Sequence, residues 1–278
     1  MDNQTAQPVS VAVSGIMGRM GQQIARLLFH DQSFVIAGGI ERKNHPSLGM
    51  DIGMLIRGTN SGGRVTDDPG SIPPPVDCII DFSAPSSTLA LLEFARKKKL
   101  SMVIGTTGFS QEEIEQIHQA GKEIAIVHSP NMSILVNLLF KIVGFTAGVI
   151  GDGFDAEIVE VHHKNKVDAP SGTALKLAEA IAGAYKKPLA SAARYERHGQ
   201  IGVRPRGEIG IQTLRGGDIV GEHTVMFIGT GERLEITHRA TSRENFAQGA
   251  LLAARWIAGR QPGVYGMADV LGLTGQIP

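Results

Sequence analysis

Short apolar runs alternate with amphipathic stretches along the first half of the chain. The runs at 9–13, 34–40, 76–81, 102–104 and 124–127 are almost continuously apolar, as in strands that helices cover on both faces. Between several of these runs, the stretches at 20–29, 85–99 and 111–121 have apolar side chains at helical spacing. Alternating strands and helices predict an α/β domain with a Rossmann-like, doubly wound parallel sheet.

The pattern changes beyond residue 131. A long apolar stretch at 134–150 predicts a helix, a strand-like run follows at 154–163, and residues 171–187 again have helical spacing. The strand-like runs at 207–214, 220–228 and 234–239 have no long helices between them, which is typical of an open mixed or antiparallel sheet.

These two patterns predict two domains. We expect a dinucleotide-binding domain over residues 1–131 plus 241–278, because a final helix at 243–259 can return to the first domain. We expect residues 132–240 to form a second, α+β domain for substrate binding and oligomerisation, built on the open mixed sheet.

Charge and cysteine content exclude several classes of protein. The 27 Lys and Arg residues balance 27 Asp and Glu residues, so no global field favours nucleic acid or an anionic membrane. Cys78 is the single cysteine, which excludes an internal disulfide or a Cys-based zinc cluster. The first residues lack a secretory pattern, and Asn137 and Lys141 interrupt the most apolar stretch, which we interpret as a buried helix. We expect a cytoplasmic protein with neither nucleic-acid nor membrane partners.

A glycine turn joins the first predicted strand to the first predicted helix. Backbone amides and a helix N-terminus can bind a pyrophosphate there. Met17 stands at the middle-glycine position of the usual G-x-G-x-x-G fingerprint, so the spacing alone is a weak signal and a turn without a ligand is the alternative. The candidate cofactor residues in this turn are Gly15, Ile16, Met17, Gly18, Arg19 and Met20.

Glu41 and Arg42 follow the second predicted strand. A carboxylate at this position can accept hydrogen bonds from the adenosine ribose, and a guanidinium beside it can pair with the 2′-phosphate of NADP. The pair therefore predicts that both NADH and NADPH serve as cofactors. A solvated loop carboxylate and an exposed surface charge are the alternatives.

Two further loops end strands at the same predicted edge, where ligands bind in an open α/β sheet. We expect both loops to reach the nicotinamide, with ordinary helix-capping turns as the alternative. Their candidate residues are Gly105, Thr106 and Thr107 in the first loop and Ser129, Pro130, Asn131 and Met132 in the second.

The densest group of titratable residues lies at 160–174. His162 and His163 can exchange a proton near neutral pH, Lys166 supplies positive charge or a proton, and Ser171-Gly172-Thr173 offers backbone amides at a helix start. The set suits a small anionic substrate, with a hydrogen-bonded structural side chain as the alternative for each histidine. Adjacent histidines on a strand point to opposite faces, and no helical metal motif accompanies them, so we expect no metal.

Taken in order, these motifs resemble those of the bacterial dihydrodipicolinate reductase (4-hydroxy-tetrahydrodipicolinate reductase) family. The segment HH-x-x-K-x-D-A-P-S-G-T-A is the most specific of them, and the resemblance spans nearly the whole chain. Ser129 and Met132 stand where many relatives carry Ala and Phe. The resemblance implies NAD(P)H-dependent reduction of a dicarboxylate, the cyclic conjugated imine dihydrodipicolinate, to tetrahydrodipicolinate in lysine and diaminopimelate biosynthesis.

The resemblance also implies roles for single residues. It makes His162 the proton donor and acceptor and Lys166 a second proton donor, and it places His163, Gly172 and Thr173 at the substrate carboxylates. It further implies a homotetramer formed through the sheet of the second domain.

Two other functions fit parts of the pattern. A different Rossmann reductase, such as an amino-acid dehydrogenase, would keep the glycine turn but would not need the HH-x-x-K segment. A catalytically silent dinucleotide sensor would bind NAD(P)H without turnover, and the intact pair of His162 and Lys166 argues against it.

Overall fold

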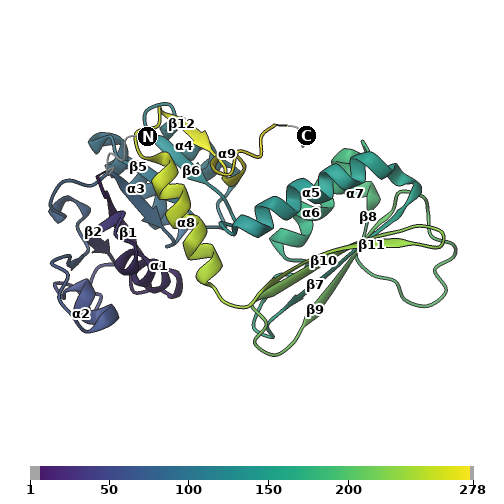
Figure 1. The fold of residues 1–278 in the computed structure, drawn as a ribbon, viewed down its shortest axis with the longest axis horizontal. Helices are drawn as coiled ribbons and strands as arrows, with labels where there is room; N and C mark the ends of the chain where they lie inside the picture. Colours follow the sequence, from purple (N-terminus) through teal and green to yellow (C-terminus); the bar gives the residue numbers. More distant parts are fainter. Residues whose placement is uncertain (1–6, 276–278) are drawn as a thin grey trace, which may run out of the picture. The chain divides into compact units, whose positions relative to one another are not determined.

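The computed structural model describes residues 7–275, which divide into two compact units. Unit 1 comprises residues 7–133 and 244–274, and unit 2 comprises residues 134–243 with Gly275. Figure 1 traces the elements of both units as a ribbon. Buried apolar side chains of unit 1 form two clusters and those of unit 2 form another, so each unit has its own core. The functions expected of the two domains stay predictions.

Unit 1 is built on a seven-stranded sheet in which the paired strands are parallel, which confirms the predicted Rossmann-like architecture. The strand order is β12-β6-β5-β4-β1-β2-β3. Every residue of β4 is buried, as the continuous apolar run predicts. The strands are β1 (Val9–Ser14), β2 (Phe34–Ile40), β3 (Val65–Thr66), β4 (Cys78–Asp81), β5 (Ser101–Ile104), β6 (Ala125–His128) and β12 (Gly263–Tyr265).

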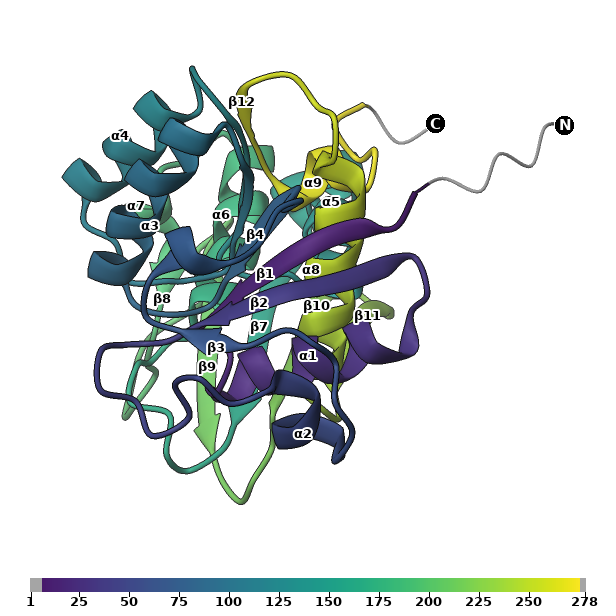
Figure 2. The same ribbon diagram turned by 90° about the vertical axis from the view of Figure 1, so that its left-hand side faces the viewer.

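Helices cover both faces of this sheet. Figure 2 shows α3 and α4 on one side of it and α1 and α8 on the other. The last long helix, α8, packs against α1 although more than 200 residues separate them in the chain. The helices are α1 (Arg19–His30), α2 (Ile52–Arg57), α3 (Pro85–Lys98), α4 (Gln111–Ala120), α8 (Glu244–Ile257) and α9 (Met267–Val270), with a 3₁₀ turn η1 (Pro69–Ser71).

Unit 2 contains a five-stranded mixed sheet of order β11-β10-β7-β9-β8, as the sequence predicts. The β7–β10 and β10–β11 pairs are antiparallel, whereas β7–β9 and β8–β9 are parallel. The strands are β7 (Asp155–His162), β8 (Ala193–Arg194), β9 (Ile209–Arg215), β10 (Gly221–Ile228) and β11 (Arg233–Ala240). The helices are α5 (Ile134–Ile150), α6 (Gly172–Ala184) and α7 (Leu189–Ala192), with a 3₁₀ turn η2 (Gly151–Gly153).

Side chains along β7 alternate between the two faces of the sheet. Ala156, Ile158, Glu160 and His162 are buried, whereas the residues between them are half-buried. Ala156 and Ile158 belong to the core that α6 closes. The period of two therefore carries a carboxylate and an imidazole onto the same covered face, at the end of the strand.

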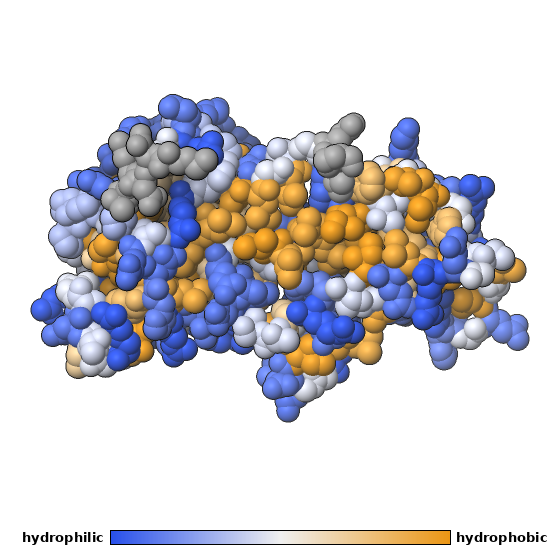
Figure 3. All heavy atoms as spheres, viewed as in Figure 1, coloured by the Kyte–Doolittle hydropathy of each residue, from blue (hydrophilic) through white to orange (hydrophobic). Residues whose placement is uncertain are grey.

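Helix α5, interpreted from the sequence as a buried helix, is buried on one face. Val143 and Ala147 pack into the core of unit 2, whereas Leu135, Phe145 and Val149 are exposed. Apolar side chains gather along this helix in Figure 3. By length and composition alone, residues 134–153 could cross a membrane. Their packing against α6 is that of a core helix with an apolar outer face.

Candidate active site

A pocket of about 650 Å³ opens in unit 1 where β1, β2 and β4 end. The carboxyl ends of parallel strands are the usual ligand site in such a sheet. Four residues predicted to bind the cofactor line it, namely Gly15, Gly18, Glu41 and Arg42.

The glycine turn fits a dinucleotide because side chains are excluded from it. Gly15 has φ +69°, and a Cβ on Gly21 would lie 2.1 Å from the Gly15 carbonyl oxygen. Gly18 is the N-cap of α1, with no side-chain cap on the first-turn amides. This backbone cradle at a helix N-terminus is the arrangement that binds a pyrophosphate.

Glu41 reaches back across the pocket to the glycine turn. Its Oε1 accepts a hydrogen bond of 2.9 Å from the Met17 amide, and its Oε2 accepts one of 3.2 Å from the Arg42 amide. The structure therefore brings together the Glu41 carboxylate and the glycine turn, which the sequence indicated as two separate candidate sites. An acceptor placed here can exchange a backbone partner for a ribose hydroxyl.

The sequence analysis missed the loop after β4. Phe82, Ser83 and Ala84 line the pocket, and Lys43 joins Arg42 on its other side. The sequence could have indicated this loop, because a loop that follows the carboxyl end of a central parallel strand lies at the edge of the sheet where ligands bind.

Asp81 fixes that loop to the next one. Its buried carboxylate accepts hydrogen bonds from the hydroxyls of Ser83, Thr88 and Thr106, and the Ser83 amide donates to Thr106 Oγ1 at 3.0 Å. Gly105 is required beside them, because a Cβ there would lie 2.3 Å from the Phe82 ring. The predicted loop at 105–107 is thus tied to the pocket wall through Asp81.

Other predicted cofactor residues are not among those that line the pocket. The side chains of Ile16 and Met132 lie in the core of unit 1, so either residue would contact a dinucleotide through its backbone. The remaining predicted residues outside the lining are Met17, Arg19, Met20, Gly105, Thr106, Thr107, Ser129, Pro130 and Asn131. In the loop after β6, Ser129 Oγ donates to the Asn131 carbonyl and the Ser133 amide donates to Asn131 Oδ1.

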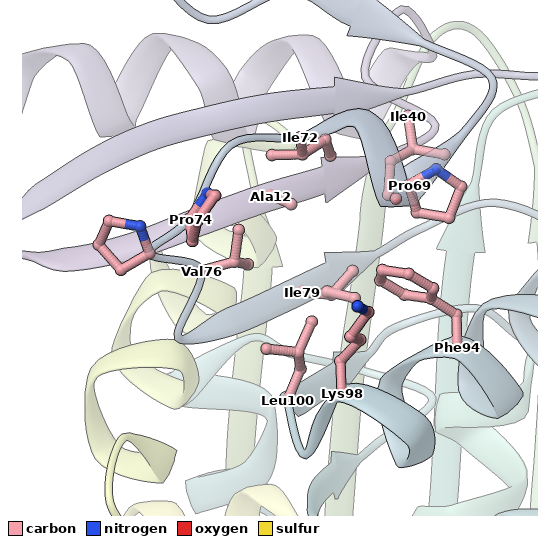
Figure 4. A pocket seen from close by; sticks show the side chains of 12 residues that line it. Ala12, Ile40, Pro69, Ile72, Pro74, Val76, Ile79, Phe94, Lys98 and Leu100 are labelled. Atoms are coloured by element: carbon pink, nitrogen blue, oxygen red, sulfur yellow. The ribbon is translucent and has the colours of Figure 1, made fainter.

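A second pocket, of about 360 Å³, lies beside β1 and β4 and is mostly apolar (Figure 4). Ile72, Ile79 and Phe94 line it, and Lys98 is its one charged lining residue in the part of the chain that the structure describes. The residues predicted to bind cofactor or substrate do not line this pocket, so it does not match the predicted chemistry.

In unit 2, His162 is the last residue of β7 and is almost completely buried. Its Nδ1 lies 2.5 Å from Glu160 Oε2. A side chain on Gly221, the first residue of β10, would meet the opposite edge of the ring, because a Cβ there would lie 2.9 Å from His162 Nε2. Glycine at this position leaves room beside the nitrogen that can exchange a proton.

The other predicted substrate residues follow His162 along the loop to α6. His163 Nδ1 is buried without a hydrogen-bond partner in the described chain, and Lys166 Nζ forms a 2.8 Å ion pair with Asp168. Gly172 and Thr173 begin α6, where Ser171 is the N-cap and its Oγ accepts from the Ala174 amide. The loop thus carries an imidazole, an ammonium group and a helix N-terminus, which suit a substrate with more than one carboxylate.

Four polar residues form a row across the covered face of this sheet, and the sequence analysis missed the row. The strand register places Thr213 of β9, Glu160 of β7, His223 of β10 and His238 of β11 side by side. His223 Nε2 lies 3.1 Å from Ser171 Oγ, and its ring meets that of His162 edge to face. Strand order decides this neighbourhood, and periodicity along one strand does not reveal it.

Two residues of the row, Glu160 and His223, have strongly lowered pKa values. Burial raises the pKa of Glu160, but hydrogen bonds from His162, Arg215 and Ser171 outweigh it and lower the pKa to about 2. Burial lowers the pKa of His223 to about 3, and the neighbouring His162 adds to the effect. Glu160 is therefore ionised and His223 neutral over the whole physiological range.

Acid is expected to destabilise the protein through these two groups. Both have a lower pKa in the folded state than in the unfolded state, so the folded state binds fewer protons. His223 contributes stability that is complete above about pH 6.5 and is lost as the pH falls towards about 3, and Glu160 adds a loss below about pH 4.5. Urea unfolding between pH 7 and pH 4 measures how steeply the free energy of unfolding falls as the pH is lowered. His223→Gln should flatten this pH dependence and the exposed His198→Gln should not; equal slopes in both variants would contradict a neutral His223.

Comparison with known proteins matches both units. Residues 9–132 match the family described as "Dihydrodipicolinate reductase, N-terminus" and residues 135–271 the one described as "Dihydrodipicolinate reductase, C-terminus". A protein of Anaeromyxobacter dehalogenans named 4-hydroxy-tetrahydrodipicolinate reductase is 49% identical over 95% of this chain and 98% of its own. A protein of the same name from Syntrophobacter fumaroxidans is 49% identical over 95% of this chain and 99% of its own.

Solved structures share the fold at lower identity. The dipicolinate-bound dihydrodipicolinate reductase of Paenisporosarcina sp. TG-14 has a TM-score of 0.72 and 22% identity, and the match covers 95% of this chain and 100% of that one. GenD2 from gentamicin A biosynthesis, solved with NAD, has a TM-score of 0.59 and 13% identity over 98% of this chain and 93% of its own. At these identities the structures show a common architecture.

Proposed function

The chain belongs to the dihydrodipicolinate reductase family, and on that premise we propose that it reduces 4-hydroxy-tetrahydrodipicolinate, or dihydrodipicolinate, to tetrahydrodipicolinate with NADH or NADPH in lysine and diaminopimelate biosynthesis. It is an oxidoreductase. The observation that carries the proposal is the pairing of a buried, carboxylate-bound imidazole, His162, with the helix N-terminus and cationic loop that follow it in unit 2.

The chemistry explains why an acid is needed beside the substrate. A bound dihydronicotinamide supplies a hydride. Hydride addition to a conjugated C=C–C=N system moves an electron pair onto the ring nitrogen, which must gain a proton as the bond forms. We assign His162 as the group that delivers this proton and Lys166 as a second donor.

The substrate carboxylates need positive charge and amide donors. We assign them to His163 and to the backbone of Gly172 and Thr173 at the start of α6, where the helix dipole favours an anion. The 2.8 Å pair between Lys166 and Asp168 supports a further electrostatic role, since Lys166 can exchange this carboxylate for one of the substrate.

For the cofactor, we assign the pyrophosphate to the backbone of the glycine turn, Gly15 to Met20, and the adenosine ribose to Glu41. We assign the loops at 105–107 and 129–132 to the nicotinamide end. Glu41 favours a free 2′-hydroxyl and Arg42 a 2′-phosphate, so the two preferences oppose each other and both cofactors are used.

Arg42→Ala should weaken NADPH binding by about 1.5–3 kcal/mol, or roughly 10- to 150-fold, and leave NADH nearly unchanged. We assign the guanidinium only to the 2′-phosphate, the group that distinguishes the two cofactors. Fluorescence titration measures the Kd of both cofactors. Added salt should reduce the difference between the loss of NADPH affinity and the loss of NADH affinity, because it screens the phosphate contact. Lys43→Ala is the matched comparison, because Lys43 lines the same pocket. An equal loss of affinity for both cofactors, or a larger loss of NADPH affinity in Lys43→Ala, would show that Arg42 is not the residue that binds the 2′-phosphate.

His163→Ala should raise KM for the substrate about tenfold and change kcat by less than about threefold, because a carboxylate contact is shared by the ground and transition states. The dicarboxylate dipicolinate serves as an independent probe, and its inhibition constant should rise in parallel. A collapse of kcat at unchanged KM would instead make His163 the proton donor.

We also propose a cytoplasmic homotetramer, with the sheet of unit 2 as the contact surface. The outer face of that sheet supports it, because Val159, Val161 and Met226 are only half-buried there and Leu214 is exposed. Analytical ultracentrifugation tests the assembly, and a monomer at micromolar concentration would contradict it.

The proposed activity is tested by NAD(P)H oxidation in the presence of freshly generated dihydrodipicolinate synthase product. Turnover with this product and none with simple 2-oxo acids is the expected result. Cofactor binding without turnover would leave the dinucleotide sensor as the function.

A further inference from the structure

Glu160 is a buried, ionised residue that has no assigned role in the proposed reaction. It lies on β7 two residues before His162, and its side chain is fully buried. Five groups donate to it or face it, from the two strands β7 and β9 and the loop before α6. They are His162 Nδ1 at 2.5 Å, both terminal nitrogens of Arg215 at 2.9 Å, the Ser171 amide at 3.0 Å and Thr213 Oγ1 at 3.3 Å.

We infer that Glu160 is a positioning residue, which holds His162 in the tautomer protonated on Nδ1 and at the same time fixes the first turn of α6. The inference rests on the proposed function, since it gives the proton donor of that reaction its orientation. It assigns a role to a residue that touches neither cofactor nor substrate.

The tautomer follows from the donors around the carboxylate. An ionised carboxylate only accepts hydrogen bonds, so a ring nitrogen beside it must carry its hydrogen. Arg215 donates to both oxygens and keeps Glu160 ionised. With Nδ1 protonated, Nε2 is the nitrogen that gains and releases the catalytic proton, and it is the edge beside which Gly221 leaves space.

The same carboxylate reaches the substrate end of the site. Its Oε1 accepts from the Ser171 amide, and Ser171 is the N-cap of α6. The next two residues, Gly172 and Thr173, are those assigned to a substrate carboxylate. Glu160 therefore sets the spacing between the proton donor and the anion-binding turn, and its loss should affect both kcat and KM.

Other charged groups near the cluster favour this arrangement. His223 of β10 faces Glu160 across the sheet and is neutral, so it does not compete for the carboxylate as a cation. The Asp168 carboxylate pairs with Lys166, and the Asp168 backbone carbonyl accepts from Arg215. His162 on β7 and Arg215 on β9 are thus the ring and guanidinium groups that meet the Glu160 carboxylate among the described residues.

Glu160→Gln tests the inference, with Glu157→Gln as the matched control. Glu157 is on the same strand and also accepts hydrogen bonds from arginine, in its case from Arg197 and Arg204, but it lies on the other face. In Glu160→Gln we expect kcat to fall about 100-fold and substrate KM to rise about threefold, with KM for NADH unchanged. The alkaline limb of the pH profile should move to lower pH, because a neighbouring negative charge favours a protonated imidazole. Glu157→Gln should change none of these values.

A readout that does not require turnover separates this inference from the proposed function. ¹⁵N spectra of histidine-labelled protein, with the His162 signals assigned by their absence in His162→Gln, should show Nδ1–H in the wild type and a mixture of tautomers in Glu160→Gln. Glu160→Asp, which keeps the charge, should recover the Nδ1–H signal and part of kcat even if it unfolds at a lower temperature.

A lower unfolding temperature in Glu160→Gln with a wild-type tautomer and pH profile would overturn the inference and make Glu160 purely structural. Absence of turnover in the wild type would overturn the proposed function. The ¹⁵N spectra of His162 would still test whether Glu160 sets its tautomer.

Discussion

His162→Ala should lower kcat by about 10²- to 10⁴-fold, the range for loss of a general acid. The ring nitrogen of the substrate must gain a proton as the hydride is transferred, and the variant lacks the imidazole that we propose as the donor. The Kd for NADPH should stay within about twofold of wild type, since the residues that we propose for dinucleotide binding lie in unit 1. Steady-state kinetics and cofactor titration measure the two effects.

Two controls accompany this variant. Added imidazole should restore part of the turnover, because removal of the side chain leaves a space between Glu160 and Gly221 that a free imidazole can enter. His198→Ala removes an exposed histidine from the same unit and should leave kcat unchanged. Near-normal turnover in His162→Ala would remove His162 from the mechanism.

Lys166→Ala should lower kcat/KM by about 10³-fold, with losses in both kcat and KM. The ammonium group is assigned both to a substrate carboxylate and to proton delivery, so its loss affects binding and chemistry together. The loss should be the same in NADH and NADPH assays, because neither assignment involves the adenosine end.

Lys166→Arg separates the two roles of the ammonium group. Arginine keeps the positive charge but does not give up a proton at neutral pH, so KM should approach the wild-type value while kcat stays low. Full recovery of kcat in Lys166→Arg would restrict Lys166 to electrostatics. A defect confined to NADPH would mean that Lys166 contacts the cofactor.

Local pattern was sufficient for the main architecture. The apolar run at 76–81 predicted a strand covered on both faces, and β4 is buried at every residue. Short edge elements escaped prediction. β3 has two residues and β12 has three, too few to show a period, and each depends on a neighbouring strand for its backbone hydrogen bonds.

Candidate residues for chemistry were also visible in the sequence, but their partners were not. His162 stood out because of its neighbours in the motif, whereas Arg215 and His223, which lie 53 and 61 residues further along the chain, come close to it through strand pairing. Asp81 was included only as the end of a strand, although its carboxylate joins two loops at the pocket of unit 1. Contacts of this kind depend on register and strand order, which no local period encodes.

The position of α8 in unit 1 determines the order in which the protein can be completed during synthesis. This helix covers one face of the parallel sheet beside α1, and its residues belong to the main core of unit 1. A nascent chain that ends at residue 243 contains all the strands and helices of unit 2, but on that face of the first sheet it has α1 without α8. The strands β4, β5 and β6, which α8 contacts, are thus made before unit 2 and are covered by this helix only after unit 2 has been made. A premature stop codon or frameshift just after residue 243 therefore damages the amino-terminal part of the molecule, far from the lesion in the gene.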